Sequence, residues 1–236
     1  GTMIKEIFTE NGIMITEEQE EMLQLYYEIL VEWNVKMNLT AITEYKDVIL
    51  KHFLDSALIL KSEYFINRKH ASVLDIGTGA GFPGIVLAIL CPQYTFTLVD
   101  SLMKRIEFLH IIKKELKLNH VSLYHGRAED LGHQIEFRNQ FDFVVSRAVA
   151  ELPVLLEYSI PFVKEQGYFV SYKGKRCNEE VEISHRALEK LSAEIVEVEE
   201  YSLAKECRFL IFIKNLSITD VRYPRKAGKV KKKPLY

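Results

Sequence analysis

Hydrophobic residues recur at helical spacing through the first seventy residues of the chain. Thr16 followed by Gln19 has the pattern of a capping box, which starts a helix. Apolar side chains then follow every three or four positions until a break at residues 38–40; they are Met22, Tyr26, Ile29, Leu30, Trp33 and Met37. A second amphipathic stretch covers residues 45–60. The pattern predicts an all-helical N-terminal extension over residues 1–70.

From residue 71 onward, short apolar runs alternate with amphipathic stretches. The runs predict strands at residues 72–76, 95–99, 121–124, 141–145, 168–172, 195–201 and 209–213, and the stretches between them predict helices at 83–90, 102–116, 152–163 and 179–191. Repeated strand–helix units are typical of a parallel sheet with helices on both faces. The last two strands have no long helix between them, so we expect an antiparallel last strand. This α/β, Rossmann-like core is expected over residues 71–215, and a basic C-terminal tail over 216–236.

Composition favours a globular protein of a reducing compartment. Of the 236 residues, 48% are hydrophobic and 27% are charged, so the chain can form a large core and is not expected to be disordered. No apolar run reaches the roughly 18 residues that a membrane-spanning helix needs. Neither the cysteines (Cys91, Cys177 and Cys207) nor the histidines show the spacing of a zinc site. We therefore expect a cytoplasmic protein without a metal or a disulfide framework.

Positive charge is concentrated at the end of the chain. Residues 222–236 hold seven basic residues and no acidic one; the basic residues are Arg222, Arg225, Lys226, Lys229, Lys231, Lys232 and Lys233. Because the whole chain has a net charge of -2, the remainder carries -9. A cationic tail on an acidic body is typical of a protein with a polyanionic partner, and a solvated tail that aids solubility is the alternative.

A glycine-rich segment, residues 73–84, follows the first predicted strand and leads into a helix. Its glycines allow the backbone to turn sharply and to approach a ligand closely. The next strand ends in Asp100, and an acid at that strand end is placed to accept hydrogen bonds from ribose hydroxyls. The ligand crevice of an open α/β sheet lies at the carboxyl ends of the strands, so these residues predict a nucleoside-containing cofactor.

Two cofactor classes fit this segment. Residues 79–84 match the GxGxxG pattern of dinucleotide-binding proteins, but its first glycine should follow the strand directly, and here Gly77 and Thr78 intervene. Asp75 also lies just before the glycines, giving an Asp-x-Gly-x-Gly-x-Gly form that favours S-adenosylmethionine. That cofactor has no pyrophosphate and has a cationic amine, so an acidic residue in the loop is an advantage. A nicotinamide-dependent oxidoreductase stays open as the alternative.

Two later segments lie at strand ends on the same predicted edge. After the third strand, the backbone near Ala128 could hydrogen-bond an adenine, although Glu129 beside it also has the pattern of an ordinary acidic helix start. After the fourth strand, Arg147 could position a phosphate or a neighbouring carboxylate. An interdomain salt bridge is the alternative explanation for Arg147. His52 and Asp55, three residues apart on one predicted helix face, could make such a contact or only pack.

Ordered motifs along the whole chain resemble the RsmG/GidB family of bacterial small-subunit ribosomal RNA methyltransferases. The matching segments are Trp33-Asn34-x-x-x-Asn38-Leu39-Thr40, His52-Phe53-x-Asp55-Ser56, residues 75–84, Asp100-Ser101-x-x-Lys104-Arg105-x-x-Phe108-Leu109, Arg127-Ala128-Glu129, Ser146-Arg147-Ala148 and Tyr223-Pro224-Arg225-Lys226. Ala227 departs from the family pattern, where a second proline is expected, and this affects at most the conformation of the tail. The resemblance implies S-adenosylmethionine-dependent methyl transfer to N7 of a guanine in 16S ribosomal RNA.

The resemblance also implies which residues form the site. It places Gly77, Phe82, Ala128, Glu129 and Arg147 around the cofactor, and its motifs add Asp75, Gly79, Gly81, Asp100 and Ser101, with Arg147 as the catalytic candidate. Expected RNA contacts are Lys104, Arg105, Lys173, Arg222, Arg225 and Lys226, because cations bind phosphates. We expect a monomer whose partner is 16S ribosomal RNA or the small-subunit particle. A non-catalytic RNA-binding protein with a cofactor fold is a further alternative.

Overall fold

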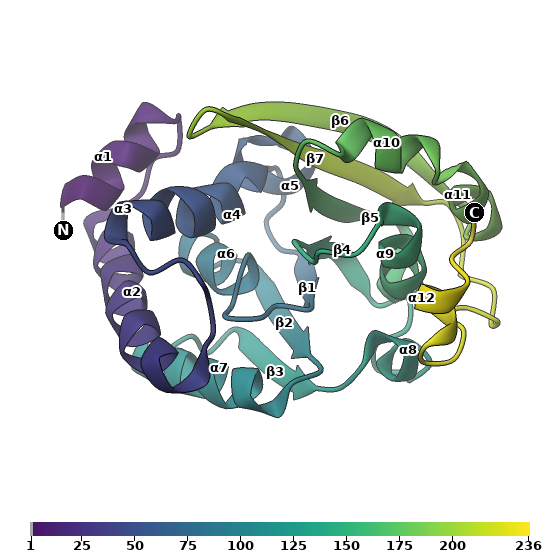
Figure 1. Cartoon of the computed structure of the whole chain (residues 1–236), viewed down its shortest axis with the longest axis horizontal. Helices are drawn as coiled ribbons and strands as arrows, with labels where there is room; N and C mark the ends of the chain where they lie inside the picture. Colours follow the sequence, from purple (N-terminus) through teal and green to yellow (C-terminus); the bar gives the residue numbers. More distant parts are fainter. Residues whose placement is uncertain (1) are drawn as a thin grey trace.

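The computed structural model describes residues 2–236, and Gly1 lies outside the described residues. A seven-stranded sheet forms the centre of the molecule, with helices against both of its faces (Figure 1). Its strands are β1 (Ser72–Ile76), β2 (Thr95–Asp100), β3 (Val121–His125), β4 (Phe141–Ser146), β5 (Val163–Lys173), β6 (Ala193–Leu203) and β7 (Glu206–Asn215). Their order in the sheet is β3-β2-β1-β4-β5-β7-β6. The predicted Rossmann-like α/β fold is confirmed.

The strand β7 runs against the direction of the other strands. It pairs antiparallel with β5 on one side and with β6 on the other, whereas β1 to β5 pair in parallel. The expected antiparallel last strand is therefore confirmed. Because β7 inserts between β5 and β6, the edge of the sheet is formed by β6 instead of by the last strand. The carboxyl ends of β1, β2 and β4 meet at one edge, where a ligand crevice is expected.

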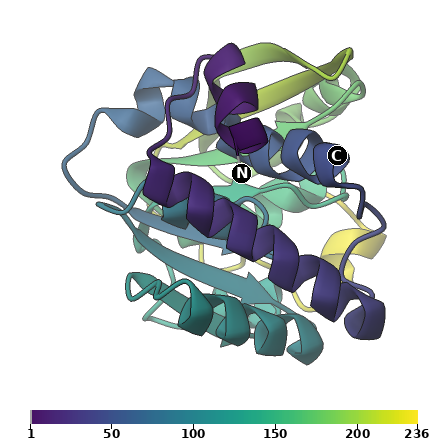
Figure 2. The same cartoon turned by 90° about the vertical axis from the view of Figure 1, so that its left-hand side faces the viewer.

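The N-terminal extension is helical, as predicted. It comprises α1 (Thr2–Glu10), α2 (Glu17–Met37), α3 (Tyr45–Val48), η1 (Ile49–Leu54), α4 (Asp55–Ala57), η2 (Leu58–Lys61) and α5 (Glu63–Ile66). The capping box of Thr16 and Gln19 starts α2, and Asn38 ends it in the left-handed conformation, with φ of 54°. The predicted helix over 45–60 contains one turn of π-helix, η1, which local sequence pattern does not reveal. Figure 2 shows α2 lying along the side of the sheet, where it packs on α6 and α7.

Shorter helices follow the strands of the core, and the last of them, α12, lies in the C-terminal tail. They are α6 (Gly84–Leu90), α7 (Met103–Glu115), α8 (Ala128–Leu131), α9 (Leu152–Ser159), η3 (Ile160–Phe162), α10 (Cys177–Glu182), α11 (His185–Lys190) and α12 (Lys229–Lys232). The single helix predicted over 179–191 is wrong at its centre. The Ser184 hydroxyl donates to the carbonyl of Glu180, and a side-chain bond of this kind competes with the helical ladder. The chain therefore forms two short helices there.

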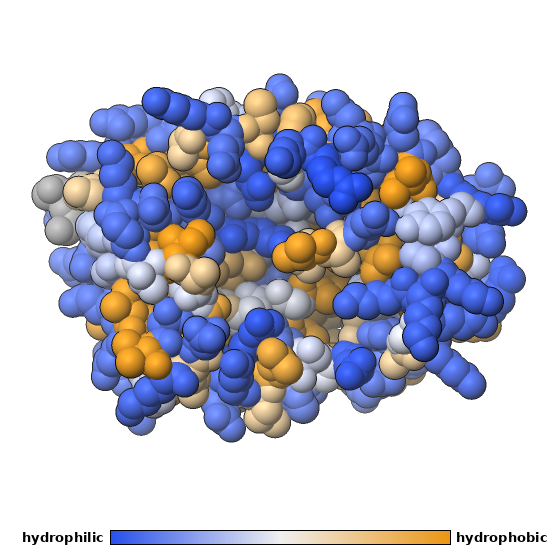
Figure 3. Space-filling view, viewed as in Figure 1, coloured by the Kyte–Doolittle hydropathy of each residue, from blue (hydrophilic) through white to orange (hydrophobic). Residues whose placement is uncertain are grey.

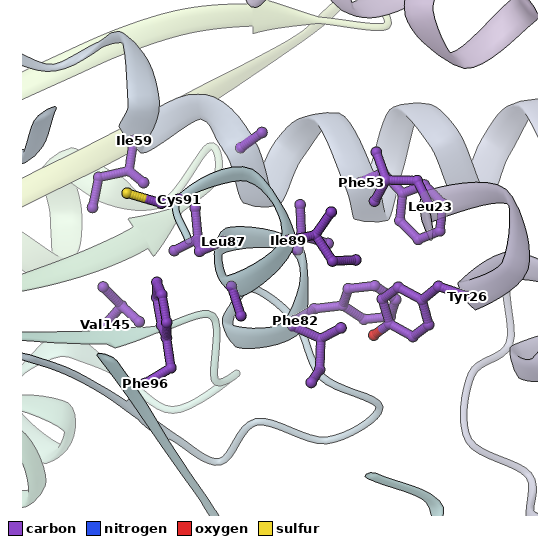
Figure 4. Packing of buried hydrophobic residues seen from close by; sticks show 14 of the residues in the cluster. Leu23, Tyr26, Phe53, Ile59, Phe82, Leu87, Ile89, Cys91, Phe96 and Val145 are labelled. Carbon is purple, nitrogen blue, oxygen red and sulfur yellow. The ribbon is translucent and has the colours of Figure 1, made fainter. Parts of the chain in front are cut away.

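Two hydrophobic clusters cover the two faces of the sheet. One joins the N-terminal helices to α6, α7 and the sheet, and Figure 4 shows Leu23, Tyr26 and Phe53 of the extension packed near Phe82 and Ile89. The other joins α9 and α11 to the tail, whose Tyr223 and Leu235 are each 5% exposed. Residues 222–236 thus fold onto the core. Among the described residues, no helix combines the length and apolar character needed to cross a membrane.

Candidate active site

The glycine loop between β1 and α6 has one side that faces open space. Gly77, Gly79 and Gly81 all have positive φ, at 67°, 59° and 106°, a conformation that L side chains rarely adopt. A Cβ at Gly79 would meet nothing within 4 Å, and one at Gly77 would meet only the Ala148 methyl group at 3.8 Å. This open side is a cradle that a side chain would fill.

Gly81 differs from the other two glycines. A Cβ there would lie 2.5 Å from the Tyr26 hydroxyl and 2.6 Å from the Ile85 side chain. Tyr26 also donates a hydrogen bond to the carbonyl of Ala80. Gly81 therefore lets the loop pack against the N-terminal extension, and we read it as a packing position of the site. Periodicity alone could not separate this role from a cofactor contact.

Asp100 holds the loop from the neighbouring strand. Its Oδ2 accepts a hydrogen bond from the backbone N–H of Gly79 at 2.8 Å, and its Oδ1 accepts one from Leu102 at 2.9 Å. The side chain is 2% exposed, and Arg105 approaches it at 3.4 Å. Ser101 follows at the exposed end of β2. Since each carboxylate oxygen accepts more than one hydrogen bond, Asp100 can hold the loop and a ligand together.

Asp75 is buried below the same loop. Its Oδ2 accepts hydrogen bonds from the Thr78 hydroxyl at 2.7 Å and from the Gly84 backbone at 2.8 Å. Its Oδ1 is buried and has no hydrogen-bond partner within the described residues. Burial raises the pKa of Asp75 to about 8, because a carboxylate is poorly solvated there. An unsatisfied buried oxygen of this kind is suited to a cationic or water-bridged ligand group.

Arg147, at the end of β4, is bound by the N-terminal extension. Its Nη1 lies 3.0 Å from Oδ2 of Asp55 and 3.2 Å from the Ser56 hydroxyl, and its Nη2 lies 3.1 Å from Nδ1 of His52. Arg208 of β7 pairs with the other oxygen of Asp55 at 2.8 Å. The His52–Asp55 face thus binds across the site, one of the two readings that the sequence left open.

Phe82 lies between the loop and this charged network. The His52 ring stacks on it, with centroids 4.3 Å apart and planes 8° apart, and the Arg147 guanidinium lies 5.6 Å from its centroid. Burial and the Arg147 charge lower the pKa of His52 to about 3, so the imidazole is neutral at physiological pH. Phe82 is 6% exposed. It joins the glycine loop to the extension, a role that the sequence could not separate from a core position.

The open face of the molecule is hollowed near its centre, over the ends of β1 and β4 (Figure 3). Ala128 and Glu129 lie further along this edge, at 8% and 9% exposure, where the Gly126 N–H donates to the carbonyl of Asp100. Glu129 also lines an open pocket of about 700 Å³, whose other wall is formed largely by the tail. The other residues of this pocket are Asp130, His133, Lys190, Arg222, Tyr223, Pro224, Arg225, Lys226, Lys229 and Leu235.

The cations predicted to contact RNA fall into two groups. Lys104, Lys226 and Arg222 are exposed, although Arg222 pairs with Asp220 at 3.0 Å. Lys173 is 6% exposed, and its Nζ lies 2.8 Å from Glu180.

The prediction that Lys173 contacts RNA is therefore wrong. Its ammonium group is buried and paired with Glu180, so it is not available to a phosphate. The Arg225 guanidinium is also largely unavailable to RNA, since it pairs with the buried Glu157 at 2.7 Å. Arg105 is partly occupied by Asp100. Lys190 joins the tail pocket from α11, and no sequence signal distinguished it from any other surface lysine.

Comparisons with known proteins agree with this geometry. A family model described as rRNA small subunit methyltransferase G matches residues 19–210. A protein of that name from Thermoanaerobacter pseudethanolicus is 46% identical over 235 residues, covering 99% of this chain and 97% of the relative. Another from Desulfitobacterium hafniense is 48% identical over 226 residues, covering 95% and 92%. A solved SAM-dependent methyltransferase from Aquifex aeolicus has a TM-score of 0.54 at 21% identity, covering 71% and 93%, which indicates a shared fold.

Proposed function

The chain belongs to the GidB family of rRNA small subunit methyltransferases G, and from this premise we propose how its site carries out the family's reaction. The enzyme transfers a methyl group from S-adenosylmethionine to N7 of a guanine in 16S ribosomal RNA. One observation of the structure supports the assignment most directly. The glycine loop is open above Gly79, while Asp100 fixes the backbone at that position through a 2.8 Å hydrogen bond.

The residues present fit S-adenosylmethionine. The open side of Gly77 and Gly79 leaves room for a ligand, and the unpartnered Oδ1 of Asp75 suits a methionine ammonium group, directly or through water. Asp100 would hold the ribose hydroxyls, and the backbone near Ala128 and Glu129 would hold the adenine. When bound, this cofactor supplies an electrophilic methyl group on a positively charged sulfur.

The reaction requires the enzyme to position the guanine and the methyl group, and it requires no proton transfer to or from N7. Guanine N7 has an in-plane lone pair and no proton to remove, so no general base is required. The chain's task is to align the nucleobase with the reacting methyl group. Arg147 is the catalytic candidate at the strand end beside the cradle. Because the purine becomes positively charged, a free cation nearby would be unfavourable. Asp55 at 3.0 Å offsets the charge of Arg147 and keeps its guanidinium oriented.

The RNA is held by cations outside the cradle. Lys104 is exposed in the first turn of α7, four residues after Asp100, and the tail exposes five lysines: Lys226, Lys229, Lys231, Lys232 and Lys233. We call these five the tail lysines. Lys226 and Lys229 line the same pocket as Glu129, so phosphates bound there would lie next to the proposed adenine end of the site.

The parts of the chain have distinct proposed roles. Residues 1–70 orient Arg147, residues 71–215 bind the cofactor, and residues 216–236 bind RNA. The enzyme would work as a cytoplasmic monomer on 16S ribosomal RNA or on the small-subunit particle.

Methyl transfer to undermethylated RNA tests this function. The protein is incubated with cofactor labelled in the methyl group and with 16S ribosomal RNA or small subunits from cells that lack the modification, and the label is mapped. We expect one labelled guanine, methylated at N7. Gly79→Val is the inactive variant for comparison, because its side chain fills the open side of the loop. Its melting temperature is measured alongside, since positive φ strains any L residue at this position. It should lose S-adenosylhomocysteine binding in calorimetry. Label at another base, or at none, would contradict the proposal.

A further inference from the structure

The loop between β4 and α9, residues 147–151, presents an apolar tip at the mouth of the site. Val149 is fully exposed, at 102%, between the half-buried Ala148 and Ala150. The methyl group of Ala148 is the nearest atom to the open side of Gly77, at 3.8 Å from a Cβ built there. The tip therefore adjoins the cradle proposed for the cofactor. An exposed valine in this position has no packing role in the protein.

The beginning of the loop is fixed by Arg147. Its guanidinium donates to the Ser56 hydroxyl and to the backbone carbonyls of Lys51 and His52, each between 3.2 and 3.3 Å, and it pairs with Asp55. These partners all belong to the N-terminal extension. Arg147, two residues before Val149, is thus tied to the N-terminal extension.

The end of the loop is fixed by a buried ion pair. Nζ of Lys173, at the end of β5, donates to the carbonyl of Ala150 at 2.7 Å and lies 2.8 Å from Oε1 of Glu180 on α10. The same Oε1 accepts the backbone N–H of Leu152 at 2.8 Å. Lys173 and Glu180 are each 6% exposed. One buried pair therefore holds both the last residue before Glu151 and the first residue of α9.

Burying a lysine and a glutamate is costly, since both charges lose their hydration and the pair seldom stabilises a fold more than apolar residues would. The bonds that this pair makes to protein backbone all go to the turn at 150–152. The buried pair thus fixes the conformation of one loop. The loop is held at both ends, and its tip, Val149, is fully exposed. Fixed loops of this kind are what a site needs to place a substrate within a few tenths of an ångström.

We propose that loop 147–151 is a preset platform for the target nucleobase. Val149 and the flanking alanines contact the face of a purine displaced from the RNA stack, and Lys173 and Glu180 are positioning residues that hold the platform. Displaced bases are bound between apolar and aromatic side chains, so an apolar tip beside a methyl-donor cradle suits this ligand. The proposal rests on the proposed function, because it specifies how that site holds its substrate.

Replacing Val149 by serine tests the contact. The matched control is Val35→Ser, which changes a valine that is 87% exposed on α2. Neither change should move the melting temperature or the affinity for S-adenosylhomocysteine. Val149→Ser should lower kcat/KM for RNA methylation by about tenfold, the scale of losing an apolar contact to a substrate, while Val35→Ser leaves it unchanged. Equal kcat/KM values for the two variants would overturn the platform.

A double variant, Lys173→Met with Glu180→Gln, tests the positioning pair without leaving an unpaired buried charge. We expect folded protein with normal S-adenosylhomocysteine affinity, and a raised KM for RNA together with a lowered kcat. The control is Ile112→Ala, a core change in α7 that destabilises the fold away from the loop. Ile112→Ala should keep normal kinetics below its melting temperature. If the double variant does the same, its residues only stabilise the fold and the positioning role is wrong.

The outcomes separate this inference from the function on which it rests. If the unchanged protein methylates no RNA guanine, the proposed function fails first. If it methylates RNA and Val149→Ser equals Val35→Ser, only the platform fails. Should the double variant not fold, Val149→Ser still decides, because its side chain is fully exposed.

Discussion

Positive side chains at the mouth of the site and in the C-terminal tail differ in their partners. Arg147, Lys173 and Arg208 each lie within about 3 Å of a buried carboxylate, on Asp55 or Glu180. The tail lysines are exposed, and within the described part of the chain none of them forms an ion pair. Paired cations set positions, whereas free cations remain able to bind a polyanion. The difference separates residues that shape the site from the residues that we propose to hold RNA.

Neutralising the tail lysines should have the largest effect. Changing all five to glutamine removes the free cations but keeps Tyr223, Val230 and Leu235 buried, so the fold should survive. If the unchanged tail contacts about five phosphates, log affinity should fall against log salt with a slope near -4, or roughly 250-fold between 50 and 200 mM salt. The variant should bind RNA more weakly and with a clearly shallower slope, because Lys104 and Arg222 remain. Filter binding over a salt series measures both, and equal slopes would remove the tail from RNA binding.

Arg225→Gln should affect stability more than RNA binding, unlike its neighbours in the tail. Arg225 pairs at 2.7 Å with Glu157, which is 0% exposed. Removing one partner of a buried pair costs about 3–5 kcal/mol, and the lower end is expected because Glu157 keeps the backbone N–H of residue 225. Urea unfolding measures the loss. The double variant with Glu157→Gln should regain part of it, and no regain would mean that the pair is not the cause.

Asp100→Ala tests a buried anion that accepts hydrogen bonds from two backbone groups and pairs with Arg105. We expect S-adenosylhomocysteine binding to weaken by about 1.5–3 kcal/mol, the scale of a hydrogen bond to a charged group. Some stability should be lost as well, since Gly79 and Leu102 each lose an acceptor. Calorimetry and urea unfolding separate the two effects. Lower stability with unchanged affinity would make Asp100 a purely structural residue.

Asp75 is a buried acid with no ion-pair partner among the described residues. Its raised pKa of about 8 predicts how stability and ligand binding depend on pH. An acid whose pKa rises on folding binds more protons in the native state, so the free energy of unfolding should fall as the pH rises from about 4 to 8. Binding an ammonium group needs the carboxylate. S-adenosylhomocysteine binding at pH 7 should therefore release a proton, and affinity should rise up to about tenfold from pH 6 to 7. Calorimetry in two buffers of different ionisation enthalpy measures the release, and Asp75→Asn should abolish it. Binding without proton release in the unchanged protein would contradict this role.

Arg222→Gln should have the smallest effect and is the matched control for Arg225→Gln. Its ion pair with Asp220 joins side chains that are 71% and 42% exposed. Pairs of this kind contribute about 0–1 kcal/mol, so urea unfolding should detect a change under roughly 0.5 kcal/mol. A loss equal to that of Arg225→Gln would show that pairing and burial do not distinguish the two arginines.

The distinction between buried, paired cations and exposed, free ones also shows what could not be predicted from the sequence. Strand–helix alternation and the ordered motifs were sufficient to predict the fold, the family and the neighbourhood of Gly79, Asp100 and Arg147, because periodicity and loop chemistry are local. Lys173 was misassigned since its partner Glu180 reaches it through the fold, and a buried lysine has the same letter as an exposed one. The packing of Gly81 against Tyr26 and of Phe82 against His52 could not be predicted either, because these partners come from the distant N-terminal extension.

The pair between Arg225 and Glu157 also bears on the order in which the chain is made. Ribosomes release a protein from its N-terminus, and Glu157 precedes its partner by 68 residues. During that interval the carboxylate of α9 has no cation, and the cluster on this face lacks Tyr223 and Leu235. The core around Glu157 therefore stays incomplete until the last residues of the chain are made. Translation of residues 222–236 is the step that closes it.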